Sequence, residues 1–387
     1  MPELRTCVPR LAVLSALLFV HAAVDAHAFE DFGDADGARA LQRLQPAQAR
    51  SQRLHIVQIG DSHTAGDFFT DRLRERLQQR MGDGGIGWAM PMYANGQRLS
   101  RVGYDNTGFS LLSSRSSGEA DYPFGGLIAM GSGVPATLTI KSKRGDTPKQ
   151  RVTMLLNQGP VDPDLELVDA DGARIAISSP IVDSIWSSVT FEARLPYALH
   201  TQGSPETRVG GWWLHSDGPG AVVSAVGING AELSQWTRWR SDWMRDLAAG
   251  EPDIVAIAYG TNEAFRTPLE PAQVREALES AIDRLRQQMP GVGVLVIGAP
   301  ESLKTTAGTC GQRAPSLDMV QQVQREVARE RRTLYWDWQA AMGGACSMKS
   351  WIGSGLARRD GVHFSREGYE RAADDLFEGL VAAAGAR

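Results

Sequence analysis

The feature that most constrains this chain is a short apolar run that ends in a Gly-Asp-Ser turn. Residues 54–59 are mostly apolar and rich in β-branched side chains, which predicts a strand buried in a parallel sheet. Gly60, Asp61 and Ser62 follow directly, and a helical pattern occupies about 68–81. A strand, a sharp turn and a helix in this order place the Ser62 hydroxyl at the carboxyl edge of the sheet, where α/β proteins carry out their chemistry.

The same alternation of strand and helix returns after residue 216. The predicted strands there are 221–226, 253–259, 293–297 and 333–337, and the predicted helices are about 232–247, 271–288, 316–331 and 366–384. Together with the first strand, this pattern predicts an α/β fold with a three-layer parallel sheet. We expect residues 29–50 to form a short helical lead-in to that sheet.

Between residues 97 and 216 the pattern changes to short alternating runs separated by turn clusters. Examples are the runs at 136–140, 152–156 and 165–168. Such runs predict an antiparallel β-sandwich inserted after the first strand–helix unit. The predicted organisation is therefore an α/β domain in two parts, 29–96 and 217–387, with the insertion at 97–216 between them.

One stretch before this insertion is unusually rich in glycine. Four of the seven residues at 82–88 are glycine. We expect that stretch to be irregular and to lie at the sheet edge beside the serine.

The first 28 residues have the pattern of a secretory signal. Arg5 and Arg10 precede an apolar run at 11–24, and Ala26-His27-Ala28 matches a small-x-small cleavage site. The run is too short to span a bilayer comfortably, so we expect export to the periplasm or beyond, without stable membrane insertion after cleavage. The net charge of −5, with no basic stripe, argues against nucleic acid as a partner.

The cysteines are compatible with one disulfide, and the histidines do not indicate a metal site. Cys310 and Cys346 are the only cysteines after the predicted signal. In an oxidising compartment the two can form a disulfide near the C-terminal motif, and two free thiols are the alternative. The histidines after residue 28 are scattered, without metal-ligand spacing, so we expect no metal and no cofactor.

A serine becomes a nucleophile only when a neighbouring base takes its proton and a third group orients that base. Asp360 and His363 lie three residues apart, just before the last predicted helix. This spacing allows the carboxylate to reach one imidazole nitrogen and leaves the other free for Ser62. The alternative for His363 is a helix cap or a surface residue.

Two further predicted strands also end in residues suited to this chemistry. Gly230 follows the second strand and Asn262 follows the third. Together with Ser62, they bring backbone N–H groups and a side-chain amide to the same edge of the sheet, as an oxyanion hole requires. Ordinary turn chemistry is the alternative, because both residue types favour turns.

The chain resembles the SGNH (GDSL-type) hydrolases in four sequence blocks that occur in the same order. These blocks are Gly-Asp-Ser, Gly, Gly-Thr-Asn and Asp-x-x-His. The resemblance covers the α/β parts and implies a flavodoxin-like sheet. It also implies Ser62 as nucleophile and His363 as a base oriented by Asp360. The oxyanion hole would consist of the Ser62 and Gly230 N–H groups and the Asn262 side chain.

A narrower resemblance points to exported bacterial peptidoglycan O-acetylesterases. It rests on Gly-Asp-Ser-His-Thr-Ala-Gly at 60–66, on Gly-Gly-Ile-Gly-Trp at 84–88 and on the place of the β-rich insertion. In that family the inserted sandwich is similar to a carbohydrate-binding module. The resemblance implies a serine carbohydrate esterase that removes O-acetyl groups from peptidoglycan through an acetyl-enzyme, with O-acetylated peptidoglycan or a related glycan as partner. The alternatives are an O-acetyltransferase acting on a cell-wall or exported polysaccharide, and a non-catalytic glycan-binding protein.

Several other residues are interpreted from their type and position. Asp61 is expected to be a turn carboxylate that accepts nearby N–H groups. His63 and Glu263 either contact substrate or have surface and turn roles. The tryptophans fall into two groups. In the first group, sugar stacking and core packing are both open: Trp186, Trp212 and Trp213. In the second group, core packing is expected: Trp236, Trp239 and Trp243.

Overall fold

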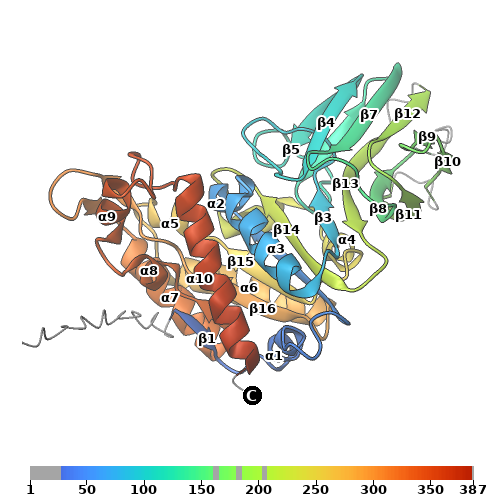
Figure 1. Cartoon of the computed structure of the whole chain (residues 1–387). Helices are drawn as coiled ribbons and strands as arrows, with labels where there is room; N and C mark the ends of the chain where they lie inside the picture. Colours follow the sequence, from blue (N-terminus) through green and yellow to red (C-terminus); the bar gives the residue numbers. More distant parts are fainter. Residues whose placement is uncertain (1–27, 160–164, 180–184, 203–206, 386–387) are drawn as a thin grey trace, which may run out of the picture.

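The computed structural model describes residues 28–159, 165–179, 185–202 and 207–385. The predicted secretory signal lies outside the described residues, except for Ala28. At the centre is a mixed sheet with helices on both faces (Figure 1). Its strands are, in spatial order, β1 (Phe29–Asp31), β19 (Leu334–Trp336), β16 (Gly293–Ile297), β15 (Ile254–Ala258), β2 (Arg53–Gly60) and β14 (Gly220–Gly227).

Strand β2, which leads to the serine turn, lies between β15 and β14 and is parallel to both. Gly60, its last residue, pairs in register with Gly227 of β14 and with Ala258 of β15. Three strand ends therefore lie side by side, and the segments that follow them meet at one edge of the sheet. This arrangement brings together parts of the chain that are more than 160 residues apart.

The two faces of the sheet carry different helices. Alternate strand residues point to opposite faces; Ile56 packs in the core under α1, α3 and α10, and Val57 packs in the core under α6 and α7. These helices are α1 (Ala35–Gln42), α3 (Phe68–Met81), α6 (Pro271–Gln288), α7 (Leu317–Glu330) and α10 (Arg366–Gly385). No helix in the described ranges has both the length and the apolar character needed to cross a membrane.

Two antiparallel sheets occupy the β-rich part of the chain, at the upper right of Figure 1. The strands of the first, in order, are β10 (Arg174–Ile177), β9 (Leu165–Val168), β12 (Tyr197–Gln202), β7 (Pro135–Ser142) and β4 (Val102–Thr107). Those of the second are β11 (Ser187–Ala193), β8 (Gln150–Asn157), β13 (Arg208–His215), β6 (Leu127–Gly131) and β5 (Phe109–Ser113), with β3 (Gly85–Ala89) also paired to β13. Leu138 and Leu199 of the first sheet and Met154 of the second are fully buried in one shared core.

The second antiparallel sheet also packs against the α/β part. Strand β13 is covered on both faces: Trp212 contacts Tyr197 of the other sheet, whereas the Trp213 ring lies 4.8 Å from that of Trp88. Trp213 Nε1 donates to the backbone oxygen of Asp246, 3.0 Å away, in α4 (Met244–Ala248). The β-rich part is therefore joined to the parallel sheet through an aromatic core.

These contacts decide the roles of the tryptophans. Both residues of the adjacent pair in β13 are fully buried, because the strand has packed layers on each side. Sugar stacking is therefore wrong for the first group, and core packing is confirmed for the second. The buried tryptophans are Trp186, Trp212, Trp213, Trp236, Trp239 and Trp243.

The sheet differs from the prediction at its edge. Residues 29–50 were expected to be helical, but β1 (Phe29–Asp31) precedes α1 and pairs with β19 in the antiparallel direction. The prediction of an all-parallel sheet is therefore wrong at this strand. A three-residue edge strand is too short to show a period of two.

Two other elements also differ. The glycine-rich stretch contains the regular strand β3, whose glycines allow close packing: a Cβ on Gly87 would lie 2.2 Å from Ser224 Oγ of β14. The helix expected at 232–247 is split into a 3₁₀ segment, η1 (Leu233–Arg238), and the short α4. The tryptophans that suggested a continuous helix are all buried: Trp236 lies in η1, and Trp239 and Trp243 lie between η1 and α4.

Candidate active site

Ser62 begins a four-residue helix, α2 (Ser62–Ala65), directly after β2. The preceding Asp61 caps it, since Asp61 Oδ1 accepts the His63 N–H at 2.9 Å. Gly60 allows the sharp turn because a Cβ there would lie 2.4 Å from Thr64 Oγ1 and 2.5 Å from the Ala258 carbonyl oxygen. Asp61 is therefore a turn carboxylate, as the sequence predicts. Burial raises the pKa of its carboxyl to about 7.

Ser62 and His363 are 301 residues apart in the chain but in contact in the structure. Ser62 Oγ lies 3.0 Å from His363 Nε2, and His363 Nδ1 lies 3.0 Å from Asp360 Oδ2. Asp360 Oδ1 accepts the N–H groups of Val362 and His363 at 2.8 and 2.9 Å. Partial burial works in the opposite direction, but these hydrogen bonds and the imidazole hold the pKa of Asp360 below its ordinary value. The carboxylate therefore faces the imidazole in its ionised form near neutral pH.

The loop that carries Asp360 and His363 is held by one hydrogen bond within itself and one from a neighbouring segment. The Arg358 N–H donates to the His363 carbonyl oxygen, 2.8 Å away, which closes the loop on itself. The Leu303 N–H donates to the Gly361 carbonyl oxygen, also at 2.8 Å. Leu303 begins a hairpin of β17 (Leu303–Thr305) and β18 (Gln312–Arg313). This hairpin therefore directly supports the loop that carries Asp360 and His363, the candidate catalytic loop.

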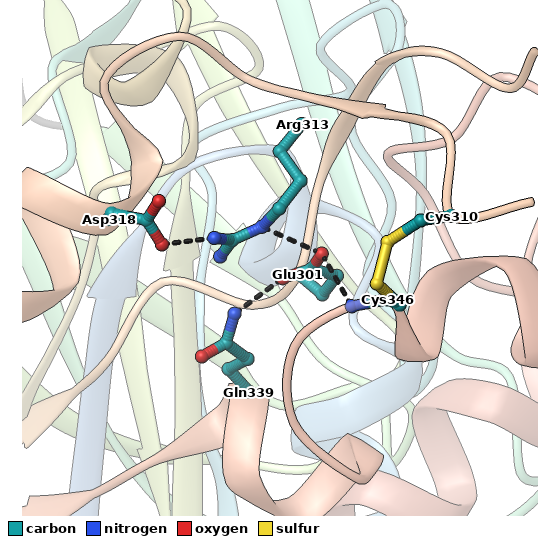
Figure 2. Close-up of a disulfide and its surroundings, with 6 residues drawn as sticks. All are labelled: Glu301, Cys310, Arg313, Asp318, Gln339 and Cys346. Carbon is teal, nitrogen blue, oxygen red and sulfur yellow. Dashed lines mark hydrogen bonds and ion pairs between the residues drawn. A yellow bond between two sulfur atoms is a disulfide. The ribbon is translucent and has the colours of Figure 1, made fainter. Parts of the chain in front are cut away.

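A disulfide ties that hairpin to the helical segment before the catalytic loop (Figure 2). Cys310, in the hairpin turn, is bonded to Cys346, and their Cα atoms are 4.8 Å apart. The disulfide prediction is thus confirmed, and free thiols are excluded. Below it, the fully buried Glu301 accepts Arg313 Nε at 2.9 Å and the Cys346 N–H at 3.2 Å.

The predicted oxyanion donors line the same cleft as Ser62 and His363. Within the described residues, no protein acceptor meets the N–H groups of Ser62 and Gly230. Asn262, in α5 (Thr261–Ala264), donates from Nδ2 to the Ala231 carbonyl oxygen at 2.8 Å, while Asp61 Oδ2 is 3.5 Å away. The first contact orients the amide, and the second is long, so one amide N–H remains available to a ligand.

These groups line one cleft of about 700 Å³, together with Ser62 and His363. A serine hydroxyl in contact with an imidazole, with unused donors beside it, can attack a carbonyl carbon and stabilise the resulting oxyanion. The arrangement can therefore catalyse acyl transfer. The described residues contain no group of three or more His, Cys, Asp or Glu side chains that could hold a metal ion.

His63 and Glu263 support the site from behind, so surface positions are wrong for both. His63 Nδ1 contacts Tyr369 Oη at 3.0 Å, and burial beside His363 lowers the pKa of His63 to about 3. Glu263 accepts the Gly260 N–H at 3.0 Å and the Leu233 N–H at 2.8 Å, and burial raises its pKa to about 7. His63 is therefore neutral above about pH 3, and Glu263 is neutral below about pH 7. Exposed histidine and glutamate side chains carry charge over part of these pH ranges.

Part of the cleft wall was not predicted from the sequence. Phe68 stacks on Tyr369 with ring centroids 6.1 Å apart, and the Arg98 guanidinium lies 4.2 Å from the Phe68 centroid. Arg358 lines the cleft from the segment before the catalytic loop. These residues belong to no motif, and their sequence positions give no sign that they meet.

Comparisons with known proteins match the chain and its fold. The family model described as "Peptidoglycan O-acetylesterase, N-terminal" matches residues 84–198, and the GDSL-like Lipase/Acylhydrolase family model matches residues 188–371. A solved structure of a peptidoglycan O-acetylesterase in action is 40% identical, with a TM-score of 0.85, and the match covers 93% of this chain and 100% of that one. No protein in the curated set matches.

Two other solved structures are far less similar. A GDSL-like lipase from Bacteroides thetaiotaomicron is 16% identical with a TM-score of 0.33, over 42% of this chain and 76% of that one. A family two carbohydrate esterase from Cellvibrio japonicus is 10% identical with a TM-score of 0.32, over 73% and 99%. These similarities are too low to inform the function.

Proposed function

Because this chain belongs to the peptidoglycan O-acetylesterase family and is a GDSL-like serine esterase, we propose that it removes O-acetyl groups from peptidoglycan after export to the periplasm or beyond. The observation that carries the proposal is the chain of contacts from Ser62 through His363 to Asp360 in a chain that matches such an esterase over 93% of its length. The signal pattern at residues 1–28 supports export.

In the first half of the proposed reaction, Ser62 Oγ attacks the acetyl carbonyl carbon. His363 Nε2 takes the serine proton, and Asp360 stabilises the imidazolium that forms. The carbonyl oxygen becomes an oxyanion that accepts the N–H groups of Ser62 and Gly230 and an amide N–H of Asn262. The tetrahedral intermediate then collapses, the bond to the sugar oxygen breaks, and His363 returns the proton to that oxygen.

In the second half, water hydrolyses the acetyl-enzyme. His363 takes a proton from the water, which attacks the acetyl carbonyl carbon, and the same donors stabilise the second oxyanion. Acetate leaves when the bond to Ser62 Oγ breaks and His363 reprotonates the serine. If a sugar hydroxyl replaces the water, the reaction becomes the acetyl transfer of the alternative function.

The proposed domain organisation follows the sequence boundaries. Residues 29–96 and 217–387 form a flavodoxin-like hydrolase domain, and residues 97–216 form an inserted β-sandwich similar to a carbohydrate-binding module. The shared core between the two antiparallel sheets supports a sandwich, and the family-model match at 84–198 supports its assignment to this esterase family. Strand β3 precedes residue 97 but pairs with β13 of the insertion.

The test is acetate release from O-acetylated peptidoglycan. Wild type should release acetate, and Ser62→Ala should release none above the rate without enzyme. Ser110→Ala, an exposed serine of β5, is the matched control and should keep the wild-type rate.

The products of the same assay separate the alternatives. Free acetate supports hydrolysis, whereas acetylated acceptor sugar in place of free acetate would favour the transferase. Release from small acetyl esters but not from peptidoglycan would contradict the proposed substrate and leave the mechanism intact. Glycan binding without any ester cleavage would contradict the enzyme itself.

A further inference from the structure

The cleft around Ser62 is basic although the chain as a whole is acidic. The chain carries a net charge of −5, yet the residues lining the cleft include Arg98 and Arg358 and no aspartate or glutamate. Asp360 lies behind His363 and is already bonded to it. In a cleft without carboxylates, the positive charge of the arginines acts directly on a bound ligand.

Arg98 is anchored to the segment that carries the nucleophile. Its backbone N–H donates to the carbonyl oxygen of Ala65, the last residue of the serine helix, at 3.0 Å. Two residues later, the Ser100 N–H donates to the buried Asp67 Oδ2 at 2.6 Å. The Arg98 guanidinium rests on the Phe68 ring. Its backbone and side chain are thus held beside the cleft at three points.

Arg358 is anchored through its backbone to the segment that carries the base. Its N–H donates to the His363 carbonyl oxygen, and its carbonyl oxygen accepts the Gly361 N–H. Within the described ranges, neither Arg98 nor Arg358 has a carboxylate at ion-pair distance, whereas the nearby Arg366 pairs with Glu370 at 3.4 Å. The backbones of both arginines are therefore anchored to the catalytic segments, and their guanidinium groups are still available to a ligand.

The β-rich part contributes a third guanidinium. Arg115 follows β5, and a Cβ built on Gly230 would lie 3.5 Å from Arg115 Nη2. The neighbouring Ser114 is fully buried, and its Oγ accepts Gln235 Nε2 at 2.9 Å and Trp239 Nε1 at 3.2 Å. This network fixes the segment of Arg115 against the residues that follow Gly230.

We propose that Arg98 and Arg358, assisted by Arg115, bind a carboxylate of the substrate and make this esterase specific for acetylated glycans that carry one. Guanidinium groups bind carboxylates through charge-assisted hydrogen bonds, which are stronger than those between neutral partners. The inference rests on the proposed function, since peptidoglycan carries carboxylates on the lactyl group of muramic acid or on the peptide attached to it. A neutral acetylated glycan lacks this contact.

The experiment measures competitive inhibition of 4-nitrophenyl acetate hydrolysis by two sugars that differ only in charge. N-acetylmuramic acid carries the lactyl carboxylate, and its amide does not. In wild type the acid should inhibit about tenfold more tightly than the amide, as expected for a charge-assisted contact. In the Arg98→Gln/Arg358→Gln double variant the two inhibition constants should agree within about twofold.

The ratio of inhibition constants is measured within each protein, so it does not depend on that protein's own turnover. Arg245→Gln is the matched control, because Arg245 is an exposed arginine of α4 whose side chain is 81% accessible and lies outside the cleft. It should keep the wild-type ratio. N-acetylmuramoyl-L-alanine, which carries its carboxylate on the amino acid, shows which carboxylate the arginines prefer.

A second measurement on wild type covers the case in which the double variant does not fold. The inhibition constant of the acid should weaken as salt rises from low to physiological ionic strength, and that of the amide should not. Equal constants for acid and amide in wild type would overturn the inference. Acetate release from peptidoglycan tests the proposed function separately. The acid can still inhibit more tightly than the amide even if no acetate is released from peptidoglycan.

Discussion

At Gly60, the side chain of Thr64 and the carbonyl oxygen of Ala258 occupy the space that a Cβ would need. This close approach fixes where β2 ends and therefore where Ser62 begins its helix. Behind the turn, Asp61 and Glu263 are buried carboxyl groups that bind backbone N–H groups. Asp61 thus holds the turn that carries Ser62, and Glu263 holds the neighbouring turn at Gly260.

Asn262→Ala should lower kcat about a hundredfold or more, because one oxyanion donor contributes roughly 3 kcal/mol to the transition state. The thermal midpoint should change little, since the loss is one partly exposed hydrogen bond to the Ala231 carbonyl oxygen. Steady-state kinetics with a small acetyl ester and a thermal melt measure the two effects. Asn106→Ala, at an exposed position of β4, is the control and should match wild type in both. A kcat within threefold of wild type would exclude Asn262 from the oxyanion hole.

The raised pKa of Glu263 makes the stability of the protein depend on pH. Burial raises the pKa of the folded carboxyl to about 7, from 4.5 in a free side chain. Its contribution to stability is therefore fully present below about pH 4.5 and is lost as the pH rises to about 7. The unfolding free energy of wild type relative to Glu263→Gln should fall by about 3 kcal/mol over that range.

Urea unfolding at several pH values between 4.5 and 8 measures this difference. Glu119→Gln, at an exposed position of the β5–β6 connection, is the matched control for replacing a glutamate by glutamine. A constant difference for Glu263→Gln would mean that the buried carboxyl keeps its ordinary pKa.

Among the elements, the β17–β18 hairpin has the clearest structural role. It supports the catalytic loop through the hydrogen bond from the Leu303 N–H to the Gly361 carbonyl oxygen. The disulfide joins its turn to the start of α9 (Ser347–Gly353), and Glu301 accepts hydrogen bonds from Arg313 of the hairpin and from the Cys346 N–H (Figure 2). A covalent link and a buried carboxylate therefore hold two segments that support the loop of Asp360 and His363.

The Cys310→Ser/Cys346→Ser double variant should lose about 3–4 kcal/mol of unfolding free energy, because the disulfide closes a loop with a sequence separation of 36. Reduced wild type should show a similar loss. Urea unfolding with and without reductant measures both, and the double variant should not respond to reductant. An unchanged urea midpoint of wild type after reduction would contradict a stabilising role of the disulfide.

On the scale of the whole molecule, the aromatic core between β13 and α4 joins the β-rich part to the parallel sheet. Trp213 contacts Trp88 and Phe124, and its indole N–H donates across the boundary to Asp246. Arg151 of β8 adds an ion pair to Glu251, whose atoms lie 3.0 Å apart. We therefore expect the two parts to unfold together.

Trp213→Ala should cost about 3–5 kcal/mol, as expected for removing a large aromatic side chain from a core. Calorimetry should show one transition in wild type and a lower midpoint, or two separate transitions, in the variant. Val134→Ala, a substitution at a position that is 56% exposed in the β-rich part, is the control and should shift the midpoint little. Two independent transitions in wild type would show that the aromatic core does not couple the parts.

The sequence alone predicted the elements whose signal is local. The buried runs of β15 and β16 and the helical pattern of α6 lie within one residue of their predicted ends, because periodicity is set by neighbours in the chain. The disulfide was one of two open alternatives, and the structure contains it. The spacing of Asp360 and His363 was also informative, since three residues on one loop are enough to bring a carboxylate to an imidazole.

Other features depend on partners distant in sequence, and only the tertiary structure decided them. β1 is antiparallel because of its position beside β19, and β3 is a strand because β13 pairs with it. His63 is buried because Tyr369 and the aromatic rings around it come from the other end of the chain. The serine turn itself is predicted from the sequence. The chain alone indicates a nucleophile and its partners, and the packed sheet adds the basic cleft in front of it.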